Sequence, residues 1–212
     1  MVKRKSDIYD IPLELPYSEE KKRPWYEKVI RDAQERISVF ALDHQWSEHV
    51  STPLIKRVRV FETKEQFDRE VKSAFHYDSE TRLPQSFSAI VSDGTLLAVM
   101  PNTYSENYKV GQEEDAYEKL FTHELAHELH IRILQGEEDQ MGPRWFFEGF
   151  ALYAANQFDN SQLELTKEDI REIVSLDKPV TYAYYRLVMD ELLLHMELKE
   201  AVEHAKYQSF KI

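Results

Sequence analysis

The chain has 212 residues, 42% of them hydrophobic and 31% charged, which is typical of a soluble globular protein that can bury a sizeable core. Its formal net charge of −12 argues against a nucleic-acid partner, because phosphate backbones are bound by clustered lysines and arginines. The absence of cysteine excludes disulfides, thiolate zinc sites and a cysteine nucleophile.

The composition also bears on the compartment. No stretch of the chain predicts a membrane span, and residues 1–16 lack the continuous apolar region of a signal peptide. A chain without cysteine fits a reducing compartment. We therefore expect a cytoplasmic protein, with a secreted enzyme that has lost its signal peptide as the alternative. No feature of the sequence predicts an oligomeric state.

The first part of the chain predicts one helix and one strand. Prolines scattered among charged residues indicate an extended lead-in over residues 1–23. Apolar positions at helical spacing then predict a helix over 24–42, with Pro24 in its first turn. Apolar and basic residues alternate through residues 54–61 (LIKRVRVF), which predicts a strand with one face in water.

The next segments predict a helix and a hairpin. Thr63 is a candidate N-cap for a helix over 65–75. Two apolar runs, 86–92 and 95–100, are joined by an Asp-Gly dipeptide. Such a dipeptide favours a tight hairpin turn, because glycine tolerates positive φ.

The second half of the chain predicts helices only. Helical patterns cover 113–135, 143–158, 166–175 and 179–207. We therefore expect an α+β fold with a single domain over 24–212. Within it, a sheet-containing lobe is expected at about 24–135 and a helical lobe at about 143–212.

Residues 123–127 read HELAH, in the middle of a predicted helix. Residues four apart share a helical face, so His123 and His127 can reach one ion. Neutral imidazoles suit zinc, which keeps one tetrahedral position for water in a catalytic site. Glu124 is placed to flank that ion, take a proton from the water and pass it to the leaving amine. The alternative is a solvated helix face or a satisfied pair of core histidines.

A second block, residues 145–151 (WFFEGFA), supplies a candidate third ligand. Glu148 is an acid among aromatic residues, where its burial would be costly without a cation. A carboxylate from the following helix completes a three-ligand site with the two histidines. Gly149 then allows another group to approach the backbone closely. The alternative is a glutamate on the exposed stripe of an amphipathic helix.

HELAH followed by WFFEGFALY resembles the gluzincin metallopeptidases (HExxH…E, MA clan), the group that contains thermolysin and the aminopeptidase N family. The second block is similar to the aminopeptidase N-type W-x-x-E-G-F-A signature. The resemblance implies a zincin-like fold, in which a small mixed sheet with a hairpin packs on the HExxH helix and a helical lobe follows. It implies zinc held by His123, His127 and Glu148, Glu124 as general base and acid, and a peptide or protein substrate.

The chain also departs from these families. It has no G-x-M-E-N segment, so the resemblance does not imply aminopeptidase activity. Leu152 stands where thermolysin-like enzymes have an aspartate, so the carboxylate that orients a ligand histidine must come from elsewhere or be absent. The chain is far shorter than members of either family and resembles a compact stand-alone gluzincin domain.

Gluzincins generally add a tyrosine or histidine that stabilises the oxyanion opposite the metal. Residues 181–185 (TYAYY) supply candidates. We predict Tyr182 for this role, followed by Tyr184 and then Tyr185. Each of these could instead be a packing or capping tyrosine.

His130 lies on the same predicted helical face as His123 and is a candidate fourth ligand. We expect it instead to hydrogen-bond to the wall of the cleft, because a third histidine would leave Glu148 without a role. The remaining histidines have no partner at metal spacing and are His44, His49, His76, His195 and His204.

The sequence therefore predicts a zinc metallopeptidase. One alternative is a catalytically degenerate zincin-fold module that binds a peptide or protein partner without cleaving it. Another is a helical interaction domain without a metal. Metal analysis and a cleavage assay distinguish the three.

Overall fold

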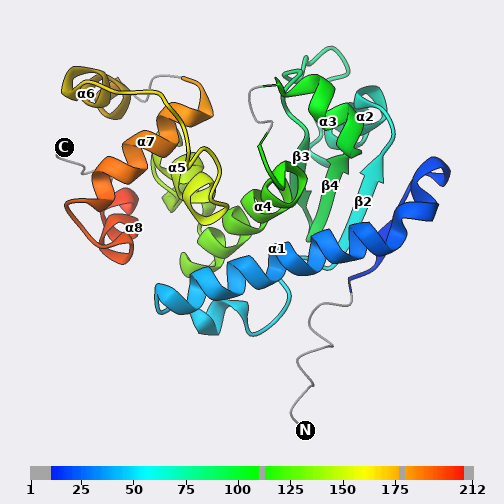
Figure 1. Cartoon of the computed structure of the whole chain (residues 1–212), viewed down its shortest axis with the longest axis horizontal. Helices are drawn as coiled ribbons and strands as arrows, with labels where there is room; N and C mark the ends of the chain where they lie inside the picture. The colour runs from blue at the N-terminus through cyan, green and yellow to red at the C-terminus, as the bar shows by residue number, and fades with distance from the viewer. Residues whose placement is uncertain (1–10, 110–112, 177–179, 208–212) are drawn as a thin grey trace, which may run out of the picture. The chain divides into compact units, whose positions relative to one another are not determined.

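The structure, a computed structural model, describes residues 11–109, 113–176 and 180–207. These residues form a mixed α+β fold with eight α-helices and a small four-stranded sheet (Figure 1). This confirms the predicted fold class at the level of a small mixed sheet followed by helices. Among the described residues, no helix combines the length and apolar character needed to cross a bilayer.

The chain divides into two compact units. The first contains residues up to Glu35 together with Thr52–Glu124, and the second contains Arg36–Ser51 and the chain from Leu125 onward. This division differs from the predicted lobes, because residues 36–51 belong with the helical part and the boundary falls inside a helix. Residues 36–51 contact the helices of the second unit, where the Phe40 ring lies 5.7 Å from the Phe150 ring.

Over the residues that the structure describes, the first unit contains one 3-10 helix, two complete α-helices and the first parts of two more. They are η2 (Tyr17–Lys22), α1 (Arg23–Asp43), α2 (Lys64–Ala74), α3 (Pro101–Asn107) and α4 (Ala116–Ile133), of which α1 and α4 continue into the second unit. The strands are β1 (Leu13–Glu14), β2 (Arg57–Phe61), β3 (Ala89–Ser92) and β4 (Thr95–Val99).

The sheet has the order β1-β2-β4-β3, with β2, β4 and β3 side by side in Figure 1. β1, β2 and β4 are parallel, and β3 is the antiparallel outer strand. Val58 pairs with Leu96, and Leu97 pairs with Ile90. The sheet is therefore mixed, as predicted, and its antiparallel edge is formed by the hairpin.

β4 is buried on both faces. Consecutive strand residues point to opposite sides of a sheet, and Leu96, Leu97, Ala98 and Val99 are all buried. α2 packs against β2 and β4, and the Tyr117 hydroxyl of α4 donates a hydrogen bond to the Val99 carbonyl at 2.7 Å. The beginning of the HELAH helix is thus attached to the central strand of this unit.

Two local predictions in this unit are confirmed. The Thr63 hydroxyl caps α2 by accepting from the Gln66 N–H at 3.3 Å, and the Gln66 side chain accepts from the Thr63 N–H at 3.4 Å. The hairpin turn has φ of 49° at Asp93 and 73° at Gly94, the positive values that the Asp-Gly dipeptide favours. The strand predicted over 54–61 is shorter than expected and begins at Arg57.

The chain ahead of α1 has more structure than an extended lead-in. Residues 1–10 of the predicted lead-in lie outside the described residues. Of the rest, Leu13–Glu14 joins the sheet as β1, and the six residues of η2 form a 3-10 helix. Pro16, in the extended conformation, directly precedes η2.

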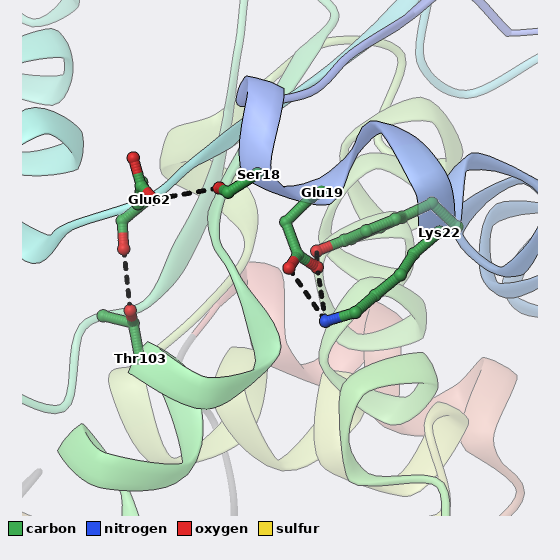
Figure 2. A network of polar contacts seen from close by, with 6 residues as sticks. Ser18, Glu19, Lys22, Glu62 and Thr103 are labelled. Carbon is green, nitrogen blue, oxygen red and sulfur yellow. Dashed lines mark hydrogen bonds and ion pairs between the residues drawn. The ribbon is translucent and has the colours of Figure 1, made fainter.

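Polar contacts tie η2 to its surroundings (Figure 2). The buried Glu19 carboxylate accepts hydrogen bonds from the Tyr26 hydroxyl of α1 and from Lys22, both at 2.8 Å. The Ser18 hydroxyl donates to Glu62, just after β2, at 2.9 Å. Because a buried carboxylate is stable only with such partners, this network holds η2 against α1 and the end of β2.

The second unit is helical. Besides the ends of α1 and α4 it contains η3 (Ser47–Val50), η5 (Glu138–Gln140), α5 (Arg144–Ala154), α6 (Lys167–Leu176), α7 (Tyr182–Leu193) and α8 (Leu198–Lys206). α5 packs along α7. A Cβ added at Gly149 would lie 3.1 Å from the Tyr185 carbonyl oxygen and 3.2 Å from Met189 Cβ. The prediction that Gly149 permits a close approach is therefore confirmed, and α7 is the element that approaches.

Several helix boundaries differ from the predicted ones. The helix predicted over 179–207 is two helices, because the chain turns after Leu193 and Glu197 is extended before α8; its predicted start lies outside the described residues. The helix predicted to reach residue 158 ends at Ala154, since Asn156 adopts a φ of 53°. α3 was not predicted at all. Its first residue is Pro101, a position where the missing N–H costs nothing.

Candidate metal centre

α4 carries the HELAH segment in a buried environment. His123 and Glu124 are 5% and 9% exposed, while His127 is half-buried. Leu125 and Ala126 between the histidines are buried as well. α4 runs without interruption through the segment and ends before Gly136, whose φ of 95° and hydrogen bond to Ile131 close the helix. The histidine pair therefore lies on a regular helix with one turn between its members.

α5 supplies the acidic residue. Pro143 precedes the helix, and all but three of the residues from Arg144 to Ala154 are buried. Glu148 is 7% exposed in this apolar helix. Its burial is the feature that the sequence indicated, and it is costly for a carboxylate without charged or hydrogen-bonding partners.

The structure brings the three predicted ligands together. His123, His127 and Glu148 each offer one ligand atom, and these atoms lie within 4.8 Å of one another. Within the second unit, Nε2 of His127 is 3.7 Å from Oε2 of Glu148. Ligand atoms around a tetrahedral zinc are about 3.4 Å apart, as its bond lengths require. A small inward movement of the side chains would therefore allow this group to hold a metal ion.

Tyr182 is the predicted tyrosine that contacts the group. Its hydroxyl, at the first turn of α7, donates a hydrogen bond to Oε1 of Glu148 at 3.3 Å. Tyr185 is instead buried, and its hydroxyl accepts a hydrogen bond from the Val180 N–H at 3.3 Å. Among the residues that the structure describes, Tyr184 makes no hydrogen bond to Glu148.

Arg144 is a residue of this site that the sequence analysis missed. Its Nε lies 4.0 Å from Oε1 of Glu148, one helical turn further along α5. Burial acts to lower the pKa of the Arg144 guanidinium, but the charge of Glu148 and a hydrogen bond to Tyr182 outweigh it and raise that pKa. The signal that could have found it is the spacing of four residues on one helix, which places an arginine beside the candidate ligand.

His130 is a core residue outside the ligand group. It is 0% exposed and stacks on Phe150 with ring centroids 4.5 Å apart. Burial, with smaller contributions from His127 and Lys206, lowers its pKa to about 3. Neither ring nitrogen has a hydrogen-bond partner in the described part of the chain, so the expected hydrogen bond to the cleft wall is wrong.

Comparisons with known proteins do not identify a relative. No protein-family model, no curated protein and no solved structure matches the chain. The support for a function therefore comes from the residues of the candidate metal centre themselves.

Proposed function

We propose that this chain is a zinc-dependent peptidase of the gluzincin type, which hydrolyses peptide bonds in a peptide or protein substrate. The observation that carries the proposal is the convergence of His123, His127 and Glu148 from two successive helices within 4.8 Å. Two imidazole nitrogens and one carboxylate oxygen form a donor set typical of catalytic zinc sites, which keep a further position open.

The donor set favours zinc over the common alkaline-earth ions. Calcium and magnesium prefer six or more oxygen ligands, whereas imidazole suits zinc and its neighbours among the transition metals. A zinc ion in this site would supply Lewis-acid activation of a water molecule and of the scissile carbonyl. The burial of Glu148 also fits a cation, since the ion would compensate the carboxylate charge.

Glu124 is the proposed general base and acid. It follows His123 directly on α4, and its 9% exposure leaves it in a largely water-excluded environment. A carboxylate beside the reacting water can accept its proton and deliver it to the leaving amine, which typically contributes a factor of about 10²–10⁴ to the rate. Such proton transfer distinguishes a peptidase from a protein that only binds zinc.

The outer strand of the sheet supports a peptide substrate. β3 pairs with β4 on one side and is the antiparallel edge of the described sheet. An extended peptide can add to such an edge through main-chain hydrogen bonds, without a particular side-chain sequence. The alternative function, a zincin-fold module that binds a peptide without cleaving it, would use the same strand.

Metal analysis and a cleavage assay test the proposal together. The protein, dialysed against zinc and then against buffer, is expected to retain one zinc ion per chain and to cleave members of a quenched fluorescent peptide library. Glu124→Gln is expected to retain zinc and to lose activity by a factor of about 10²–10⁴. Glu118→Gln, the same substitution earlier on α4, serves as the matched control and is expected to retain both properties.

The possible failures are distinct. Zinc binding without any cleavage by the unaltered chain would favour the binding module. A chain that binds no zinc would contradict both of these functions and favour the helical interaction domain.

A further inference from the structure

The two oxygens of the Glu148 carboxylate have different surroundings. Oε2 lies 3.7 Å from Nε2 of His127, on the side of the ligand group. Oε1 accepts the hydrogen bond from Tyr182 at 3.3 Å and lies 4.0 Å from Nε of Arg144. One oxygen is therefore beside another candidate ligand, and the other faces two donors.

Both donors are held on helices with fixed relative positions. Arg144 is the first residue of α5, the helix that carries Glu148 itself, and Tyr182 is the first residue of α7. α5 and α7 approach so closely at Gly149 that an added Cβ would be 3.1 Å from the α7 backbone. Arg144 and Tyr182 also interact with each other, since Tyr182 contributes to the raised pKa of the Arg144 guanidinium. The Glu148 side chain is thus hydrogen-bonded to the neighbouring helix, and the same oxygen lies 4.0 Å from the guanidinium of Arg144 on its own helix.

Such contacts affect how a carboxylate binds a metal. A hydrogen bond from a hydroxyl and a nearby guanidinium both stabilise negative charge on the oxygen they face. They also fix the rotation of the carboxylate, so the second oxygen is presented to an ion in one orientation. Residues that orient metal ligands in this way typically change metal affinity by a factor of about 10–100 when they are mutated.

We propose that Tyr182 and Arg144 are positioning residues that hold Oε1 of Glu148, so that Glu148 binds the metal through Oε2 alone. The inference rests on the proposed function for the presence of the metal. It gives Tyr182 a role other than the oxyanion stabilisation predicted from the resemblance. A one-oxygen carboxylate together with two imidazoles leaves the coordination open to water, as a catalytic site requires.

Zinc affinity separates the two roles of Tyr182. The dissociation constant is measured by competition with a chromophoric chelator for the unaltered chain, Tyr182→Phe and Arg144→Gln. Positioning predicts affinities weakened by a factor of about 10–100 in both variants, with partial recovery in Arg144→Lys. Oxyanion stabilisation alone predicts unchanged affinity for Tyr182→Phe and a kcat lower by about 10²–10³.

Cobalt substitution gives a second readout that does not depend on activity. The visible absorption of Co²⁺ is strong in four-coordinate sites and weaker when a further ligand atom binds. Tyr182→Phe is expected to weaken this absorption, because the released Oε1 can then also reach the ion. Tyr184→Phe, the same substitution on the same helix, is the matched control and is expected to leave the spectrum and the zinc affinity unchanged.

The outcomes separate this inference from the proposed function. If the unaltered chain binds zinc and both Tyr182→Phe and Arg144→Gln bind it equally well with an unchanged cobalt spectrum, the positioning role is wrong and the metal site remains. If the unaltered chain binds neither ion, the proposed function and this inference are both wrong. Should Tyr182→Phe fail to fold, the variants Arg144→Gln and Arg144→Lys decide the question. Weaker zinc binding by Arg144→Gln with recovery in Arg144→Lys supports the positioning role. Unchanged zinc binding by Arg144→Gln overturns it.

Discussion

Protonation of His130 is expected to destabilise the protein in mild acid. Burial lowers its pKa from 6.5 to about 3, so between these values the unfolded chain binds a proton that the native chain does not. The stability that His130 contributes is therefore complete above pH 6.5 and is lost as the pH falls towards 3. The loss is about 1.4 kcal/mol per pH unit, which gives about 2 kcal/mol at pH 5.

The variant His130→Phe removes this proton-binding site and keeps an aromatic ring to stack on Phe150. At pH 7 we expect it to be as stable as the original chain or more stable, because two buried ring nitrogens without hydrogen-bond partners are replaced by carbon. Between pH 7 and pH 5 its free energy of unfolding should fall by about 2 kcal/mol less than that of the original chain.

Urea denaturation at pH 7, 6 and 5 measures the difference, with a chelator present throughout so that loss of metal in acid does not contribute. His195→Phe is the control, because it makes the same substitution at an exposed position away from the contact of His130 with Phe150. If His130→Phe and the original chain lose the same free energy between pH 7 and pH 5, His130 is not a buried neutral residue and the reasoning is refuted.

Three further substitutions test the packing by thermal or urea denaturation. Gly149→Ala should destabilise the protein, because the added methyl group overpacks against Met189 at a cost of about 1–3 kcal/mol. This cost exceeds the gain in helix propensity, which is at most about 1 kcal/mol. Increased stability of Gly149→Ala would show that α5 and α7 are further apart. Gly94→Ala should cost about 1–2 kcal/mol through its positive φ, and a neutral effect would contradict the turn. Tyr26→Phe should cost about 1.5–3 kcal/mol by removing a hydrogen bond to the buried Glu19 carboxylate, whereas an unchanged midpoint would argue against that bond.

The parts of the site that could be predicted from the sequence depend on local geometry. His123 and His127 share a face of any regular helix that contains them. Glu148 was recognised because an acid in an aromatic segment needs a compensating charge. The hairpin and the cap of α2 were equally predictable, because the Asp-Gly dipeptide and Thr63 act on their immediate neighbours.

The parts that could not be predicted depend on packing between distant segments. The contact of Tyr182 with Glu148 follows from how closely α7 approaches α5, which no local pattern specifies. His130 has the same helical phase as the ligand histidines, and only its burial against Phe150 separates it from them. The turn between α7 and α8 was missed because apolar residues continue through it at helical spacing.

The participation of Glu148 in zinc binding tests the metal centre most directly. Zinc is titrated into metal-free protein in competition with a chelator, for the original chain, Glu148→Gln and the control Glu128→Gln, a glutamate of α4 outside the ligand group. We predict one tightly bound zinc per original chain, unchanged affinity for Glu128→Gln, and affinity weakened by about 100-fold or more for Glu148→Gln, since a direct ligand contributes more than the residues that orient it. Equal zinc affinity in Glu148→Gln and the original chain, or no zinc binding by either, would contradict the metal centre.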